Sequence, residues 1–285
     1  MSKHVTFNKN VIECDWITVG SFDERNRRRW ETVLSSEFAI NQYEAKQQMY
    51  VGTRYTGGFV GQGEQRGLVH TICKVTGANA NKVLYRILRA SAGNYRFTRM
   101  DIQLTIDLPE FHSARKLADH LKSSQNLSIR LIENGGMDTV YVGSRQSARM
   151  WRIYVKEDSE KNLYLRFELE VKNGKDNLAD RLALNIKKNG HRIMASYFFN
   201  HLDRLNLPEA YTAILSDFRT GGTAPLPKEV RDTGGKTWRW LDGVVKNSII
   251  KYASESHGRA EYVINWLIEI IDTISRGMKN EQSGN

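Results

Sequence analysis

Tyr154 stands between two cations in the segment RMWRIYVK, residues 149–156. Polar and apolar residues alternate here, which predicts a β-strand with one face against a core. Arg152, Tyr154 and Lys156 would share the polar face of that strand. Nearby positive charge lowers the pKa of a phenol, so this arrangement favours the phenolate, an oxygen nucleophile. The alternative interpretation is an ordinary aromatic residue on a half-exposed strand.

Two other segments alternate in the same way and carry carboxylates on their polar faces. Residues 97–107, FTRMDIQLTID, present Asp101 and Asp107, and residues 163–172, LYLRFELEVK, present Glu168. Carboxylates on one face suit a hard divalent cation. The alternative, which the alternation alone favours, is the solvated side of an edge strand. Three such strands lying together would join these carboxylates to the tyrosine in one cluster.

Composition restricts the class of partner. The 285 residues are 40% hydrophobic and carry a formal net charge of +10. That charge favours a polyanion such as nucleic acid, because cations set against phosphates release counterions. The only cysteines, Cys14 and Cys73, are far apart, which argues against a disulfide framework and a cysteine-based zinc site. The N-terminus lacks an apolar signal segment and no apolar run could span a membrane, so we expect a cytoplasmic protein.

Periodicity and turn residues predict an α+β fold. Its antiparallel sheet would carry helices on the face opposite the site, and two similar halves would be compatible with it. The strands are expected at 11–20, 97–107, 127–133, 138–142, 149–156 and 163–172, hairpins at 50–76, and helices at 23–49, 79–92, 111–124, 176–189, 191–204 and 208–217. We expect a catalytic domain at 1–218, a glycine- and proline-rich linker at 219–236, and a helical segment with a disordered tail at 237–285.

Five segments appear in an order that resembles the replication initiation factor family. They are CDWITV, TRMDIQLTID, TVYVGSRQSARMWRIYVKE, RFELEVK and KTWRWLDGVV, and together they extend over about residues 11–250. The family comprises rolling-circle initiators of some Gram-positive plasmids, proteins of filamentous phages, and related relaxases. Its patterns run as Arg-x-Asp with a second Asp, Tyr-x-Gly-Ser-Arg, Arg-x-Tyr-x-Lys and Arg-x-Glu. Each motif is weak alone, and their order gives the resemblance its weight.

The resemblance implies a metal-dependent nickase that starts rolling-circle replication through a 5′-phosphotyrosine intermediate. Tyr154 would be the nucleophile, Asp101 and Glu168 the ligands of Mg²⁺ or Mn²⁺ with Asp107 as a third candidate, and Lys156 and Arg152 the residues that hold the phosphate. Arg99, Arg166 and the Gly143-Ser144-Arg145 turn would contact the DNA backbone. The implied partners are origin duplex and single-stranded DNA, a second copy of the chain, and host helicase and polymerase, with no membrane.

Two observations narrow this expectation. The seven histidines form no His-x-His pair, which argues against nickases that use that motif and for carboxylate ligation. A conjugative relaxase of this kind usually carries a helix-turn-helix domain ahead of the catalytic part, and the short stretch before CDWITV leads us to expect none. A non-catalytic DNA-binding protein on the same scaffold stays open. The ending KTWRWLDGVV favours a phage over a plasmid origin.

Overall fold

The computed structural model of the chain describes residues 11–124, 126–174 and 176–219. The chain divides into two units, Met1–Arg231 and Asp232–Asn285, and every described residue belongs to the first. The predicted linker, apart from Arg219, and the predicted C-terminal helical segment lie outside the described residues.

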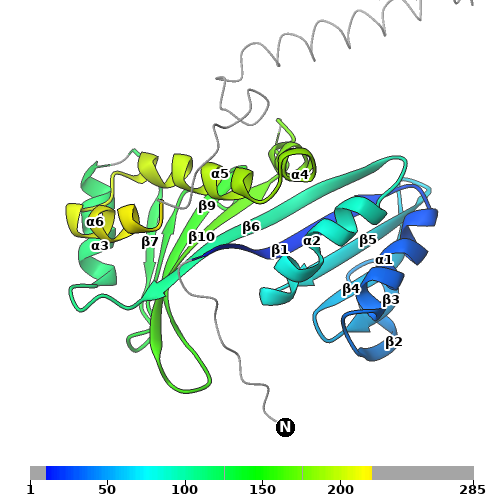
Figure 1. The fold of residues 1–285 in the computed structure, drawn as a ribbon, viewed down its shortest axis with the longest axis horizontal. Coiled ribbons are helices and arrows are strands. Elements are labelled where there is room, and N and C mark those ends of the chain that lie inside the picture. Colours follow the sequence, from blue (N-terminus) through cyan, green and yellow to red (C-terminus); the bar gives the residue numbers. More distant parts are fainter. Residues whose placement is uncertain (1–10, 125, 175, 220–285) are drawn as a thin grey trace, which may run out of the picture. The chain divides into compact units, whose positions relative to one another are not determined.

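Ten strands of the described part form one antiparallel sheet, in the order β2-β3-β4-β5-β1-β6-β10-β9-β8-β7 (Figure 1). The strands are β1 (Ile12–Ser21), β2 (Ile40–Gln47), β3 (Tyr50–Tyr55), β4 (Gly58–Gln65), β5 (Leu68–Thr76), β6 (Tyr95–Asp107), β7 (Ile129–Ile132), β8 (Thr139–Val142), β9 (Arg149–Glu157) and β10 (Leu163–Lys172). The helices are α1 (Arg25–Ser35), α2 (Ala78–Ala90), α3 (Ala114–Ser124), α4 (Leu178–Asn189), α5 (Arg192–Leu202) and α6 (Glu209–Asp217), with a 3₁₀ turn η1 (Asp203–Leu205). This confirms the predicted α+β fold.

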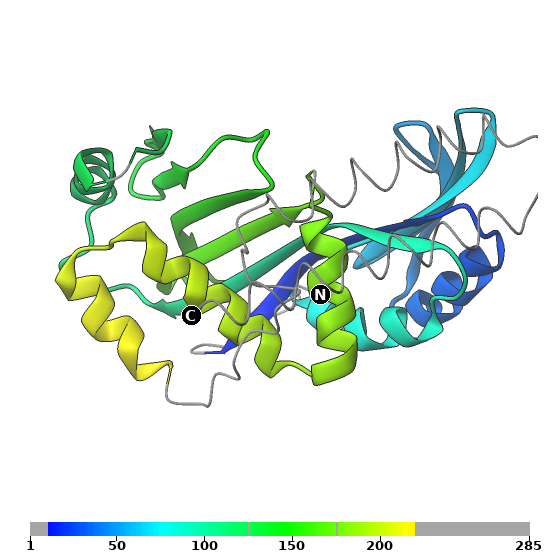
Figure 2. The ribbon, with the colours of Figure 1, turned by 90° about the horizontal axis from the view of Figure 1, so that it is seen from above.

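The sheet consists of two halves that repeat one topology. Each half runs strand, helix, four strands, helix, which gives β1, α1, β2 to β5 and α2 in the first and β6, α3, β7 to β10 and α4 in the second. In both halves the first strand is innermost and pairs with the last, and the other strands follow outward. The two innermost strands, β1 and β6, run side by side and form a seam between the halves (Figure 2).

All six α-helices contribute to one core against one face of the sheet. Met100, Ile102 and Leu104 of β6 belong to that core, and so do Trp151 and Ile153 of β9. Successive strand residues point to opposite faces, so the polar residues between these apolar ones lie on the other side. We call that side the open face. The alternation seen in the sequence therefore places Tyr154 and its cationic neighbours on the open face, as predicted.

The prediction of one helix over residues 23–49 is wrong. The helix α1 ends at Ser35, and residues 40–47 form the edge strand β2. The Ser36 hydroxyl donates to the Val33 carbonyl at 2.8 Å, a local bond that competes with helix continuation. Pairing with β3 supplies the backbone bonds of β2, and such a distant partner cannot be read from local propensity. The hairpins predicted within residues 50–76 are confirmed as β3 to β5.

Candidate active site

The register of three neighbouring strands brings the predicted chemical residues together on the open face. The strand β10 lies between β6 and β9, with Glu168 opposite both Gln103 and Arg152. The next pair along the strands is Arg166 opposite Tyr154. The open-face cluster, as we define it, contains Asp15, Arg99, Asp101, Arg152, Tyr154, Arg166, Glu168 and Glu170. Asp101, Glu168 and Tyr154 therefore lie in one cluster. The sequence predicted this only if the three strands were neighbours.

The Tyr154 hydroxyl donates a hydrogen bond to Glu168 Oε2 at 2.9 Å. Burial raises the pKa of the Tyr154 phenol, and the negative charge of Glu168 raises it further, while Arg166 acts in the opposite direction. The prediction that flanking cations would favour the phenolate is therefore wrong in this state. The reason is geometric, because the guanidinium of Arg152 turns to carboxylates on neighbouring strands instead of to the phenol.

Arg152 joins two buried carboxyl groups. Its Nη2 lies 2.9 Å from Asp101 Oδ2 and also bonds to Glu168 Oε1. Asp101 and Glu168 are thus bridged by one guanidinium, and both are at most 2% exposed. Burial raises the pKa of Glu168 to about 7 against the opposing charge of Arg152, and Asp101 adds to the rise. Burial also raises the pKa of Asp101, mainly opposed by Arg99.

Arg99 closes the other side of the cluster. Its Nε donates to Asp101 Oδ1 at 2.8 Å, and its Nη2 lies 2.7 Å from Glu170 Oε2. The guanidinium carbon sits 4.4 Å from the centroid of the Trp16 ring, a cation–π contact. The strand alternation places Glu170 on the same face as Glu168, and only the structure shows that it pairs with Arg99. Trp16 follows a β-bulge in β1, and no local sequence signal places it beside Arg99.

Arg166 does not fit its predicted role as a DNA-backbone contact. It is 1% exposed, its Nε donates to Thr105 Oγ1 at 3.0 Å, and its Nη1 lies 3.7 Å from Asp15 Oδ1. Its guanidinium carbon is 6.0 Å from the centroid of the Tyr154 ring. A buried side chain held in this way cannot reach a strand of DNA. Arg166 instead lies opposite Tyr154 with its guanidinium over the tyrosine ring, which corrects the sequence interpretation.

Asp107 and Lys156 lie at the far end of the site, opposite Tyr164 in the register. Asp107 is six residues from Asp101 on the same strand, a separation of about 20 Å. It therefore does not complete a metal site with Asp101, which corrects that prediction. Lys156 is close to Tyr154, two residues further along the same face. Burial and the charge of Arg166 lower the pKa of its amine.

The predicted Gly143-Ser144-Arg145 turn joins β8 to β9 at the opposite end of the cluster. Ser144 and Arg145 are exposed, and the Arg145 carbonyl accepts a hydrogen bond from Lys172 Nζ at 2.6 Å. Lys172 Nζ also lies 2.5 Å from Glu170 Oε1. The turn thus adjoins the Arg99 and Lys172 side of the site, away from Tyr154.

The donor set of the cluster suits a hard cation. Within the described ranges no three His, Cys, Asp or Glu side chains are grouped for metal binding. Asp101 and Glu168 nevertheless form a carboxyl pair bridged by Arg152, and Mg²⁺ commonly binds through one or two carboxylates together with substrate phosphate and water. Arg99 and Arg152 hold oxygens of this pair, so a metal ion would replace guanidinium contacts there.

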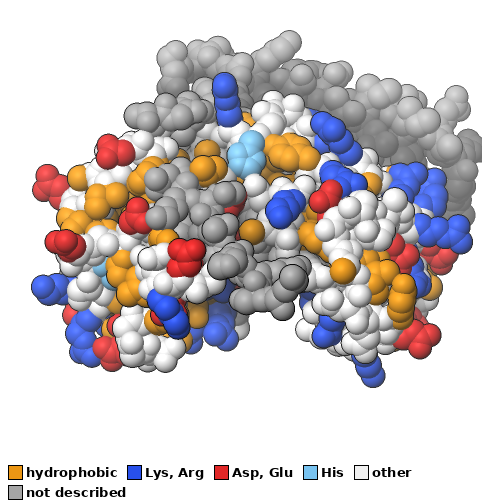
Figure 3. All heavy atoms as spheres, turned by 60° about the horizontal axis from the view of Figure 1, so that its bottom comes forward, with side chains coloured by type: hydrophobic (Ala, Val, Ile, Leu, Met, Phe, Trp, Pro, Cys, Tyr) orange, Lys and Arg blue, Asp and Glu red, His pale blue; other side chains and the backbone are white. Residues whose placement is uncertain are grey.

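Charges of both signs are interspersed on the surface shown in Figure 3, without a single continuous basic field. None of the helices in the part of the chain that the structure describes combines the length and apolar character of a membrane span. No protein-family model and no curated protein matches this chain.

Proposed function

We propose that this chain starts rolling-circle DNA replication by nicking one strand with Tyr154 as the nucleophile. The observation that carries the proposal is the 2.9 Å hydrogen bond from the Tyr154 hydroxyl to Glu168 Oε2, inside a cluster of carboxylates and arginines. Nucleophilic catalysis needs a hydroxyl in contact with a proton acceptor and beside groups that stabilise a developing negative charge. The family resemblance of the motifs points to the same residue.

In the proposed reaction the Tyr154 oxygen attacks a phosphodiester and becomes joined to the 5′ phosphate. The bond from phosphorus to the 3′ oxygen breaks, and that oxygen leaves as a hydroxyl after gaining a proton. Glu168 is placed to accept the phenol proton. The raised pKa of the phenol keeps the Tyr154 hydroxyl protonated, and the raised pKa of Glu168 makes its carboxylate a stronger proton acceptor. The covalent bond retains the energy of the broken phosphodiester for later rejoining.

Lys156 and Arg152 are the cations that we propose bind the reacting phosphate. Lys156 shares the face of Tyr154 and is half-buried, and Arg152 lies opposite Glu168 and contacts both members of the carboxyl pair. In the proposed reaction both cations would lie beside the phosphate that Tyr154 attacks. Asp101 and Glu168 would hold Mg²⁺ or Mn²⁺, which polarises a phosphate and stabilises the charge that develops on it. A second copy of the chain, host helicase and host polymerase belong to the proposal as partners.

The test is the covalent adduct. Supercoiled DNA carrying the replicon that encodes this protein is incubated with purified protein and Mn²⁺, and adducts are resolved on denaturing gels. Wild type should yield nicked circles with protein attached to their 5′ ends. Tyr154→Phe should yield neither, because it lacks the attacking oxygen. The phosphotyrosine position is then read by mass spectrometry of the nuclease-treated adduct.

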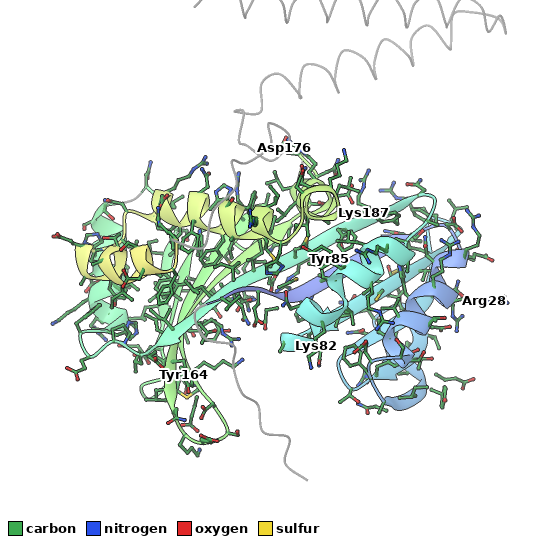
Figure 4. The ribbon with its side chains drawn as sticks, in the orientation of Figure 1. Arg28, Lys82, Tyr85, Tyr164, Asp176 and Lys187 are labelled. Carbon is green, nitrogen blue, oxygen red and sulfur yellow. The ribbon has the colours of Figure 1, made fainter. Side chains whose placement is uncertain are left out.

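Tyr164→Phe is the matched control. Tyr164 is on the neighbouring strand β10 (Figure 4), and its hydroxyl donates to Asp158 Oδ2 at 2.9 Å. This variant should keep full nicking. An adduct that survives Tyr154→Phe would make Tyr141 or Tyr164 the nucleophile. Tight DNA binding by the wild type with no adduct would favour a non-catalytic DNA-binding protein on this scaffold.

A further inference from the structure

A row of cations crosses the seam between the two halves. Thr18 on β1 lies opposite Lys74 of β5 on one side and opposite Arg99 of β6 on the other. Arg99 in turn lies opposite Lys172 of β10. Core residues flank Thr18 and Lys74 on both sides, and Met100 and Val171 of the core lie directly next to Arg99 and Lys172, so all four side chains belong to the open face. We call Lys74, Arg99 and Lys172 the seam row.

Lys74 differs from the other two cations of the row. Arg99 and Lys172 share Glu170, whereas no acidic side chain among the described residues forms an ion pair with Lys74. Its amine is partly buried beside Arg99, and both burial and that positive charge lower the pKa of the lysine. A half-buried ammonium beside a like charge, with no counterion in the described part of the chain, is a costly arrangement that an anion from outside would relieve.

We propose that the seam row binds the phosphodiester backbone of single-stranded DNA on its way to Tyr154, with Lys74 as a contact supplied by the first half. This rests on the proposed nicking function and deepens it. Lys172 and Arg166 are six residues apart on β10, and Arg166 lies opposite Tyr154. The seam row is therefore about 20 Å from the nucleophile along the strands, close enough for a single strand to span.

Two neighbours of the row fit a single strand better than a duplex. Trp16 lies in the next row with Arg99 over its ring, and its partly exposed indole is the aromatic group that an unpaired base would meet. Arg145, exposed on the turn whose carbonyl Lys172 contacts, extends the row with a fourth cation. Cations that track the backbone beside an aromatic surface are the usual means of binding single strands without sequence preference.

The test measures the affinity and the salt dependence of single-strand binding. A fluorescein-labelled oligothymidylate about 16 nucleotides long is titrated with the full-length protein in EDTA, followed by anisotropy. Lys74→Gln should weaken binding by about fivefold to tenfold at low salt. It should also reduce the slope of log K against log salt by about 0.7, the loss of one phosphate contact. Lys74→Arg should restore most of the affinity.

Lys187→Gln is the control, because Lys187 is an exposed lysine on α4, in the helix layer (Figure 4). It should bind as wild type, and thermal melting should show all variants folded. Wild-type affinity in Lys74→Gln, or an equal loss in Lys187→Gln, would overturn the seam row while leaving the nickase proposal intact. If Lys74→Gln loses more affinity for duplex DNA than for the single strand, the choice of single-stranded DNA as the ligand is overturned. No binding by the wild type would overturn the seam row as a single-strand site, whereas the nickase proposal is decided by the adduct experiment.

Discussion

The Tyr154 hydroxyl and Glu168 meet at 2.9 Å because their strands, β9 and β10, are neighbours and place Glu168 one row away from Tyr154 on the open face. This contact joins the proposed nucleophile and the carboxyl pair in a single site. It also raises the phenol's pKa, because a carboxylate next to a phenol disfavours a second negative charge. Deprotonation of the tyrosine thus depends on how substrate and metal change the charge and the contacts of Glu168.

The raised pKa of Glu168 predicts a pH-dependent stability. Its pKa is about 7 in the folded protein against 4.5 for an ordinary glutamate, so the folded state binds the proton more tightly. That stabilisation is fully present below pH 4.5 and is lost as pH rises through about 7. In metal-free buffer the unfolding free energy of wild type should therefore decrease as the pH is raised from about 5 to about 8, by at most a few kcal/mol. The urea midpoint should decrease with it.

Glu168→Gln checks the assignment of this pH dependence. A glutamine cannot titrate, so the difference between the two proteins should narrow or reverse as pH rises through 7. Glu160→Gln, at an exposed position in the loop before β10, is the control and should follow wild type. Parallel pH profiles for wild type and Glu168→Gln would place the titration on another group.

The sequence predicts the face of each site residue but not the contacts among those residues. A period of two residues fixes the face, and this placed Tyr154, Asp101 and Glu168 correctly. Pairing between strands is a non-local property, so the position of β10 between β6 and β9 required the structure. For the same reason the sequence misjudged the pKa of Tyr154, because the partners of Arg152 lie on other strands.

Because Arg166 is buried, replacing it should destabilise the fold, which replacing an exposed arginine should not do. Replacing it with methionine removes the bond to Thr105 and the cation near Asp15, and leaves the Tyr154 ring without its support. Arg166→Met should lower the unfolding free energy by about 2–4 kcal/mol, because a buried polar network loses one partner. Urea unfolding followed by circular dichroism measures the change.

Arg115→Met serves for comparison, since Arg115 pairs with Glu133 at the surface, where both side chains are more than half exposed. Its unfolding free energy should stay near that of wild type, because exposed pairs contribute little. Arg166→Lys should recover only part of the loss, because an ammonium lacks the planar guanidinium that reaches two partners. Equal stability of Arg166→Met and Arg115→Met would show that Arg166 is not part of the support.

Arg152 predicts competition between a side chain and a metal ion for the same carboxyl pair. Its Nη2 bonds to both Asp101 and Glu168, and its Nε is buried without a hydrogen-bond partner among the described residues. A divalent cation bound there would displace the guanidinium and free it to contact a phosphate. Removing this positive charge should raise the affinity for Mn²⁺ by about tenfold. That gain is a modest share of the attraction between Arg152 and the carboxylates, which the metal ion otherwise has to overcome.

Calorimetric titration of Mn²⁺ into the DNA-free protein measures this directly. Arg152→Gln should bind Mn²⁺ more tightly than wild type, and Glu168→Gln should bind it more weakly, because one variant removes the competitor and the other a ligand. The same Arg152→Gln protein should nick more slowly despite its higher metal affinity, since it lacks the cation beside the phosphate. An unchanged or lower Mn²⁺ affinity in Arg152→Gln would mean that the arginine and the metal do not share a position. The nucleophile assignment would then stand on the adduct experiment alone.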